Sequence, residues 1–234
     1  MGDDTLTSAL QRMSLITRWV DIEQELASFA RENSGSDTLQ EEYLHLKSAL
    51  CDYIASIEVP KDIESAHAHK LINQVSGDEG LYVVNFNYTN SVKHLLSKAG
   101  LDDSSISKRL LHIHGSIESK DIIFGVDDSS HVPDQHVYLN KSYAKNFADR
   151  DLINRLQAAS KVHFFGHSLG APDRAYFIQF FGRLAATHVQ TKVYFYHYGE
   201  QGLKDLMVQL RSITGNRVSA VRSNAEVSII DVSK

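Results

Sequence analysis

Apolar side chains recur at helical spacing over residues 1–80. Residues 4–31 carry them every three or four positions, which predicts an amphipathic helix. The polar stretch ENSGSD at 32–37 ends this helix, and a second helical pattern then runs over residues 39–57. A shorter helix is expected over residues 62–75. We therefore predict a helical region that contains a hairpin of two helices.

The pattern changes after Gly80 to short apolar runs rich in β-branched and aromatic residues, which predict strands. The expected strands are LYVVNF (81–86), LLHIH (110–114), DIIF (121–124), KVHFF (161–165), KVYFYHY (192–198) and EVSIID (226–231). Helical patterns separate most of them, around residues 92–96, 143–156, 176–184 and 203–213. Because strands that alternate with helices form parallel sheets, residues 81–234 are predicted to be an α/β, Rossmann-like domain with an open parallel sheet.

Composition and charge exclude several classes of protein. No apolar run approaches the roughly 18 residues of a membrane span, and the N-terminus lacks the layout of a secretory signal, so we expect a cytoplasmic protein without membrane contact. The single cysteine, Cys51, excludes an internal disulfide framework and a cysteine-rich zinc site. The formal charge is -5 and no basic run occurs, so direct nucleic-acid binding is not expected.

Polar or glycine-containing motifs follow four of the predicted strands. They are NFNYTN, HIHGS, FGVDD and FFGHSLGAPD, in that order along the chain. In an open parallel sheet, ligands bind outside the carboxyl ends of the strands. These four motifs are therefore the candidate sites.

The segment Gly166–Gly170 matches the G-x-S-x-G turn that presents the nucleophile of an α/β-hydrolase. That mechanism needs an acid and then a histidine after Ser168, each at the end of a later strand. Asp173 is the only aspartate between the serine and the later histidines, His188 and His197, and it lies in the turn or first helical turn just beyond the serine. The alternative is a turn whose backbone amides face a phosphate or ribose. A serine hydrolase is the weaker interpretation.

His112 and His114 alternate along a strand, so both can point the same way, as in a metal-binding pair. No carboxylate stands at an obvious ligand spacing, so we expect no metal and a packed or backbone-bonded histidine instead. Gly115 suits a turn that exposes His114 at the strand end. Asn85 and Asn87 share one face of the preceding strand, and Thr89, Asn90 and Ser91 supply an N-cap for the helix that follows. The polar residues of this junction either serve capping alone, or Asn87 also contacts a ligand.

The ordered motifs resemble the AbiH family, which is linked to abortive infection of bacteria by phage. NFNYTNSVKHL, LHIHGS, IIFGVD, a lysine-containing helix and VHFFGHSLGAPDRAYF with VYFYHY carry this resemblance, together with WVDIE at residues 19–23. It covers about Trp19 to Tyr198. Family members usually begin with a strand and a G-N-G-F-D turn, and nothing like it stands here. We therefore expect the first strand and glycine-rich loop to be missing.

The same motifs are more distantly similar to the sirtuin-like NAD-binding fold of several phage-defence NAD hydrolases. This similarity implies that Asn87 orients a water and that His114 accepts a proton from the ribose hydroxyls. It implies nucleotide contacts by Asn85, Thr89, Gly115, Gly125, Gly166, Ser168, Gly170 and Asp173. Sirtuin-like proteins usually carry an acid two positions after the asparagine, and Thr89 stands there. Without the glycine-rich cradle, we expect weak NAD binding or none.

Three hypotheses follow from the sequence. The first is an AbiH-like anti-phage protein that binds or hydrolyses NAD or a related nucleotide. The second is a non-catalytic nucleotide-sensing or interaction module that associates with a partner or a second copy of itself, because a lost first strand would leave an unpaired sheet edge. The third is a serine hydrolase that uses Ser168.

Overall fold

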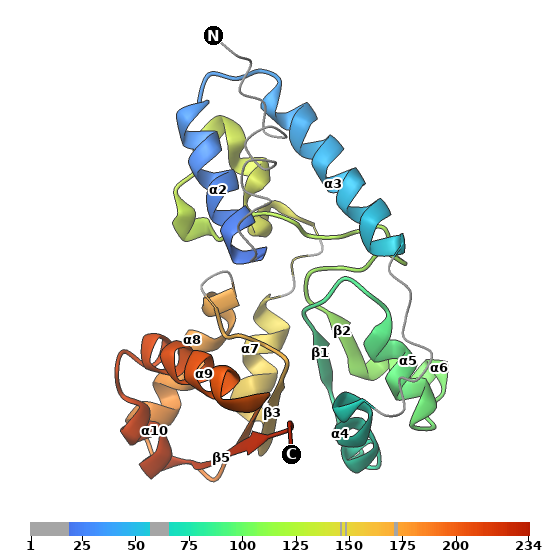
Figure 1. Cartoon of the computed structure of the whole chain (residues 1–234), viewed down its shortest axis with the longest axis vertical. Coiled ribbons are helices and arrows are strands. Elements are labelled where there is room, and N and C mark those ends of the chain that lie inside the picture. The colour runs from blue at the N-terminus through green and yellow to red at the C-terminus, as the bar shows by residue number, and fades with distance from the viewer. Residues whose placement is uncertain (1–18, 57–65, 146, 148, 171–172) are drawn as a thin grey trace. The chain divides into compact units, whose positions relative to one another are not determined.

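The structure is a computed structural model of the chain, and it describes residues 19–56, 66–145, 147, 149–170 and 173–234 (Figure 1). The chain divides into two compact units, unit 1 (Met1–Phe147) and unit 2 (Ala148–Lys234), and each contains a parallel sheet with helices. The predicted α/β class with open parallel sheets is confirmed, and it is consistent with a Rossmann-like arrangement. The domain boundary predicted at residue 80 stays a prediction.

The described part of unit 1 starts with helices, as the apolar periodicity predicts. They are α2 (Trp19–Glu32), α3 (Leu39–Ser56) and α4 (His67–Val75). Leu26 on α2 and Leu39 and Tyr43 on α3 are buried in one core with Phe124 and Leu139. The parts of the expected helices before Trp19 and over residues 57–65, and any strand before Trp19, lie outside the described residues.

The sheet of unit 1 consists of two parallel strands, β1 (Val83–Asn85) and β2 (Leu110–His112). Asn85 pairs with His112 in the register, so the carboxyl ends of both strands lie side by side. Between the strands come α5 (Ser91–Lys98), which the sequence predicts, and α6 (Asp103–Arg109). The side chain of Asp102 caps α6 by accepting a hydrogen bond from the amide of Ser105 at 2.7 Å.

The strand expected at residues 121–124 is wrong, because this segment is buried without joining a sheet. Ile122, Ile123 and Phe124 are each at most 3% exposed. The amide of Ile123 donates to the carbonyl of His114 at 2.7 Å, and residues 126–143 return as a loop with three short 3-10 helices. These are η2 (Asp128–Ser130), η3 (Asp134–Leu139) and η4 (Lys141–Tyr143). The apolar residues at 121–124 are therefore explained by burial in the core of unit 1 and not by pairing in a sheet.

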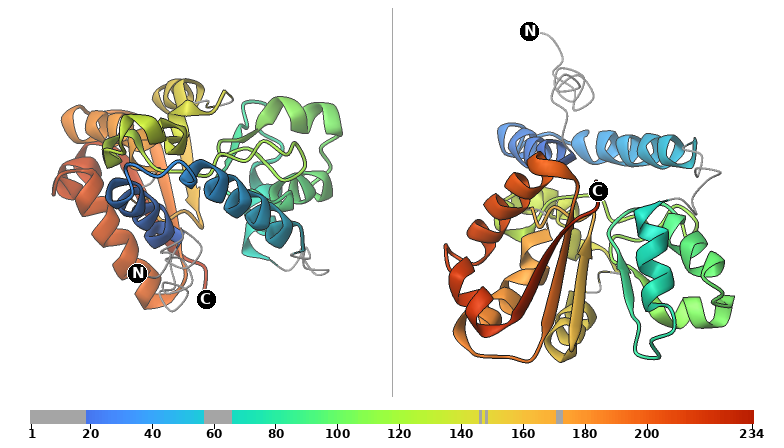
Figure 2. Two further views of the ribbon diagram at one scale, coloured as in Figure 1. Left: turned by 90° about the horizontal axis from the view of Figure 1, so that it is seen from above. Right: turned by 60° about the horizontal axis from the view of Figure 1, so that its bottom comes forward.

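Unit 2 contains a three-stranded parallel sheet in the order β3-β4-β5, and all three strands were expected from the sequence (Figure 2). Its strands are β3 (Lys161–Phe165), β4 (Lys192–His197) and β5 (Glu226–Asp231). Its helices are α7 (Asp149–Ala158), α8 (Arg174–Ala186), α9 (Gly199–Ile213) and α10 (Val218–Asn224). The sequence did not predict α10.

Aromatic side chains fill the core of unit 2. Phe164 on β3 stacks on Phe195 of β4 at 5.1 Å between ring centroids, and both pack on Phe181 of α8. The other face of the sheet carries His163 stacked on Tyr194 at 4.5 Å. Because side chains alternate along a strand, one face is the helix-covered core and the other is half-buried.

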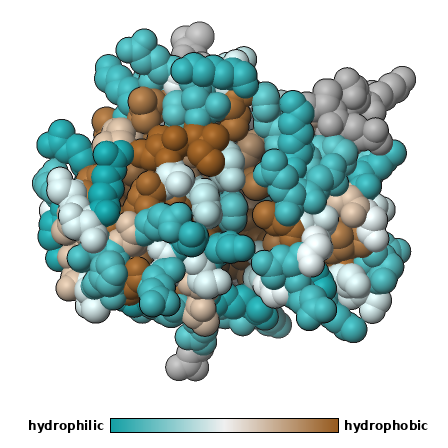
Figure 3. Space-filling model, turned by 90° about the horizontal axis from the view of Figure 1, so that it is seen from below, coloured by the Kyte–Doolittle hydropathy of each residue, from teal (hydrophilic) through white to brown (hydrophobic). Residues whose placement is uncertain are grey.

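The face drawn in Figure 3 is mainly hydrophilic, with patches of apolar side chains. Among the described residues, no helix combines the length and the apolar character that a membrane span requires.

Candidate functional site

The carboxyl ends of β1 and β2 bring Asn85, Asn87 and two histidines to one edge of unit 1. Asn85 is 3% exposed, and its Oδ1 accepts a hydrogen bond from the amide of Asn87 at 3.0 Å. Its Nδ2 donates to the carbonyl of Thr89 at 3.1 Å and lies 3.2 Å from Nδ1 of His112. Asn85 therefore shapes the turn after β1.

This turn holds Asn87 at the surface, between two residues that contact His114. Asn87 is exposed, whereas its neighbours are anchored: the rings of Phe86 and Tyr88 lie 5.6 and 6.5 Å from the His114 ring, between centroids. The hydroxyl of Tyr88 donates to the carbonyl of Ile123 at 3.0 Å. The structure thus brings the two residues proposed as catalytic, Asn87 and His114, to the ends of adjacent strands.

His114 is 5% exposed, and Gly115 after it permits a close backbone approach. Gly115 has φ +70°, and a Cβ atom at this position would overlap the backbone carbonyl of Asp121. Only glycine combines this conformation with this space. The glycine signal in the sequence therefore reflects packing between His114 and the segment that begins at Asp121.

His112 contributes to this edge in a way that the sequence did not indicate. Because the amide of Asn87 fixes Oδ1 of Asn85, the Nδ2 of Asn85 faces His112 and Nδ1 of His112 is the acceptor. Burial lowers the pKa of His112, and a hydrogen bond to the backbone of Asn87 and the charges of Asp121 and Glu118 only partly oppose this effect. The imidazole is therefore neutral at pH 7 and holds the Asn87 turn.

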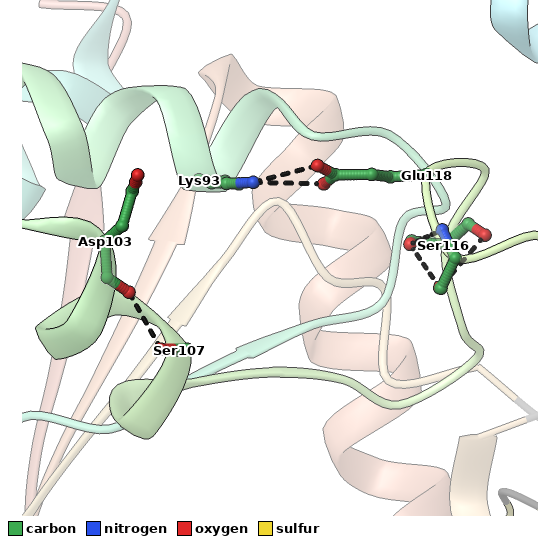
Figure 4. A network of polar contacts seen from close by, with 6 residues as sticks. Lys93, Asp103, Ser107, Ser116 and Glu118 are labelled. Carbon is green, nitrogen blue, oxygen red and sulfur yellow. Dashed lines mark hydrogen bonds and ion pairs between the residues drawn. The ribbon is translucent and has the colours of Figure 1, made fainter.

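A loop with charged and hydroxyl side chains follows Gly115 (Figure 4). The amide of Ser116 donates to Oδ1 of Asp121 at 3.0 Å, and the Ser116 and Ser119 hydroxyls lie 2.7 Å apart. Lys93 on α5 donates to both carboxylate oxygens of Glu118, at 3.0 and 3.2 Å. This pairing raises the pKa of Lys93 and lowers the pKa of Glu118. A cation thus lies near His112, which the sequence analysis missed.

The GHSLG motif forms a separate turn in unit 2, between β3 and α8. His167 accepts a hydrogen bond at Nδ1 from the amide of Leu169 at 2.9 Å, and its Nε2 lies 3.3 Å from Oδ2 of Asp173. Both ring nitrogens are therefore engaged in holding the turn. Ser168 is exposed, and its hydroxyl accepts from the amide of Gly170 at 3.3 Å. The histidine next to Ser168 is thus not available as its base, so the geometry does not favour a serine hydrolase.

The remaining predicted glycines have different surroundings. Gly166 has φ +65°, and a Cβ atom at this position would meet open space, so Gly166 serves the turn and leaves room in front of it. Gly125 is buried, and a Cβ atom there would overlap the carbonyl of Leu139. Gly125 therefore supports packing inside unit 1.

Metal ligands do not gather in the part of the chain that the structure describes. No group of three or more His, Cys, Asp or Glu side chains there could hold a metal ion. The His112 and His114 pair lacks a third ligand among these residues. The expected absence of a metal stays a prediction.

Comparison with known proteins identifies the family. A family model described as bacteriophage abortive infection AbiH matches residues 4–195. No curated protein and no solved structure matches the chain. The family match covers most of the chain and includes both turns described above, so the resemblance seen in the sequence is confirmed. The chain belongs to the AbiH family, whose description points to a role in phage abortive infection.

Proposed function

We propose that this AbiH chain acts in abortive infection by hydrolysing NAD, or a closely related nucleotide, at the β1–β2 edge of unit 1. One observation carries the proposal: an exposed amide, Asn87, is held through Asn85 and His112 at the carboxyl ends of two parallel strands, and both of its chain neighbours contact the His114 ring. Such strand ends are where open α/β sheets bind ligands.

The residues of this edge fit the hydrolysis of a glycosidic bond. A water oxygen forms a bond to C1′ of the ribose while the bond from C1′ to the nicotinamide nitrogen breaks, and the electron pair of that bond neutralises the pyridinium ring. The amide of Asn87 orients the water, and the imidazole of His114 takes the proton before releasing it to solvent. ADP-ribose, nicotinamide and one proton are the products.

His112 and Lys93 support this chemistry without reacting. His112 is a positioning residue, because it joins the Asn85 side chain to the Asn87 turn. Lys93 places a positive charge near the same edge, where the nucleotide phosphates need one. The ion pair with Glu118 keeps Lys93 charged until a phosphate competes for it.

The test is NAD turnover, followed by chromatography of nicotinamide and ADP-ribose at millimolar NAD. We expect the Asn87→Ala and His114→Ala variants to lose about 100-fold or more in kcat, as is usual when a group that orients or transfers a proton is removed. Exposed residues of the same type, Asn73 on α4 and His94 on α5, are the matched controls, and Asn73→Ala and His94→Ala should keep the wild-type rate.

The His112 variants separate positioning from stability. His112→Gln keeps an acceptor for Asn85 and should retain most of kcat, whereas His112→Leu should lower kcat with little change in KM. Circular dichroism of each variant shows whether it is folded. Wild-type protein that releases no nicotinamide, or Asn87→Ala protein that turns over at the wild-type rate, would contradict the proposal.

A non-catalytic nucleotide sensor is the second candidate, and Thr89 favours it. This residue stands where sirtuin-like proteins carry an acid, and its hydroxyl lies 3.1 Å from that of Ser91. An edge without that carboxylate can bind a nucleotide without cleaving it. Binding of NAD that is lost in Asn87→Ala, with no turnover in either protein, would support this second function.

A further inference from the structure

The side-chain amide of Asn85 has one orientation that satisfies the turn after β1. Asn85 is 3% exposed, so its polar atoms depend on protein partners. Its Oδ1 accepts a hydrogen bond from the amide of Asn87 at 3.0 Å, and its Nδ2 donates to the carbonyl of Thr89 at 3.1 Å. The reverse orientation would set donor against donor at Asn87 and acceptor against acceptor at Thr89. These two bonds therefore fix which way the amide points.

This fixed orientation requires a neutral His112. The Nδ2 of Asn85 lies 3.2 Å from Nδ1 of His112, and an amide nitrogen only donates, so Nδ1 is the acceptor. A proton on the ring turns Nδ1 into a donor as well. Two donors would then face each other beside a buried side chain. The arrangement around Asn85 is therefore incompatible with a charged His112.

A half-turn of the Asn85 amide would remove this conflict at the expense of the turn. The rotated Oδ1 accepts a hydrogen bond from the imidazolium, and a hydrogen bond with a charged donor is about twice as strong as a neutral one. The same rotation presents Nδ2 to the amide of Asn87 and Oδ1 to the carbonyl of Thr89. Both bonds that hold the turn are then lost, so a proton on His112 acts on Asn87 through Asn85.

The surroundings of His112 set where the proton binds. Burial is the largest effect and lowers the pKa of the ring. A hydrogen bond to the backbone of Asn87 opposes this lowering, and so do the carboxylates of Asp121 and Glu118 in the loop after β2. The ammonium of Lys93 on α5 adds to it. The ring therefore takes up its proton below the ordinary histidine pKa of 6.5, with two carboxylates near the new charge.

We infer that His112 is a pH switch for the turn after β1: the neutral ring holds the turn through Asn85, and the charged ring releases it at Asn87. The release is local, because the Tyr88 hydroxyl donates to the carbonyl of Ile123 at 3.0 Å without involving His112. That the release stops the chemistry of the β1–β2 edge rests on the function proposed above. The release itself does not.

The test is amide hydrogen exchange of the whole chain by NMR, without nucleotide, while the His112 ring is titrated in the same samples. The Asn87 amide reports on the switch, because it donates to Oδ1 of Asn85. The Ile113 amide reports on the sheet instead, because it donates to the backbone carbonyl of Asn85 at 3.1 Å. As His112 is protonated, we expect the protection factor of Asn87 to fall about fivefold or more, as the loss of one hydrogen bond implies, while Ile113 stays protected.

Variants assign the change to His112. His112→Gln keeps an acceptor for Asn85 but does not titrate, so the protection factor of Asn87 should no longer depend on pH. His94→Gln, which removes an exposed histidine of α5, should lose Asn87 protection as the wild type does. The wild-type protein offers a second reading that needs no variant. The Asn85 Nδ2 resonances should shift with the same midpoint as the His112 ring.

The outcomes are distinct. Loss of Asn87 protection at the His112 midpoint, present in His94→Gln and absent in His112→Gln, establishes the switch. Unchanged Asn87 protection after His112 is protonated, an equal loss in His112→Gln, or a ring that stays neutral until Ile113 also loses protection would overturn it.

Hydrogen exchange also keeps the switch separate from the proposed activity. His114 is the proposed proton acceptor, so a fall of kcat at low pH would not distinguish its titration from that of His112. A chain that hydrolyses no NAD leaves the exchange result standing. An Asn87 amide that does not respond to His112 leaves hydrolysis at the β1–β2 edge standing.

Discussion

The ion pair between Glu23 on α2 and Lys141 on η4 is buried, and it joins α2 to the loop over residues 126–143 in unit 1. The Lys141 Nζ lies 2.9 Å from Oε1 of Glu23, and the two side chains are 6% and 5% exposed. The contrasting pair in unit 1, Lys93 with Glu118, has a similar distance of 3.0 Å but side chains that are 40% and 53% exposed. Burial is therefore the main variable that separates the two pairs.

The burial of this ion pair sets how much the free energy of unfolding should change when the pair is broken. At 2.9 Å and an effective dielectric constant of about 20, the Coulomb attraction is about 6 kcal/mol, and the desolvation of two charges offsets much of it. Lys141→Met removes the ammonium group that lies 2.9 Å from the buried Glu23 carboxylate, so we expect the free energy of unfolding to fall by about 3–5 kcal/mol. Lys93→Met should cost less than about 1 kcal/mol, because its pair is solvated.

The assay is urea denaturation followed by circular dichroism, with a double variant as the internal check. Glu23→Leu combined with Lys141→Met removes both charges, and it should recover most of the stability that Lys141→Met loses. If Lys141→Met costs no more than Lys93→Met, the buried pair does not stabilise the docking of α2, and the reasoning is refuted.

Three further predictions concern local features of unit 1. Gly115→Ala should lower the free energy of unfolding by about 3 kcal/mol or more in urea, because it meets the Asp121 carbonyl at a positive φ, while Gly100→Ala, with φ +91° and open space, should cost about 1–2 kcal/mol. Tyr43→Phe should cost about 1–3 kcal/mol by removing the buried hydrogen bond from the Tyr43 hydroxyl to the Phe124 carbonyl, and ultraviolet titration should show Tyr43 ionising only near its raised pKa of about 12. Because the pKa of His112 is lowered from 6.5, the folded state binds fewer protons than the unfolded state just below that pH. The contribution of His112 to the free energy of unfolding is therefore fully present above pH 6.5 and declines as the pH falls toward the folded pKa. Urea denaturation across pH 5 to 8 should show a smaller decline in His112→Gln. A pH dependence that His112→Gln leaves unchanged would contradict the assigned cause.

The strands of unit 2 and the longer helices could be predicted because their signals are local. KVHFF, KVYFYH and EVSIID are short apolar runs with aromatic or β-branched residues, and each became a strand. The run at 121–124 looks the same in the sequence, but its neighbours in space are helix α3 and the loop that contains Leu139. Such contacts join residues far apart in the chain, so periodicity does not reveal them.

The sequence predicted where the candidate site lies, but it did not predict what each of its side chains does. Polar motifs at strand ends indicated the turn with Asn87 and the strand end with His114, since parallel strands end at one edge. The sequence did not show that the Asn85 side chain is hydrogen-bonded to Thr89, His112 and Asn87. It also did not show that Gly125 lies against Leu139. Those roles depend on side-chain orientation and on which segment packs opposite, and neither is encoded in spacing.

The most direct test of the central claim is NAD hydrolysis in water labelled with oxygen-18. The wild-type chain is predicted to release nicotinamide together with ADP-ribose that carries the label at C1′, and Asn87→Ala is predicted to release about 100-fold less of both. Release by Asn87→Ala at the wild-type rate, or no labelled ADP-ribose from the wild-type chain, would contradict hydrolysis at the β1–β2 edge.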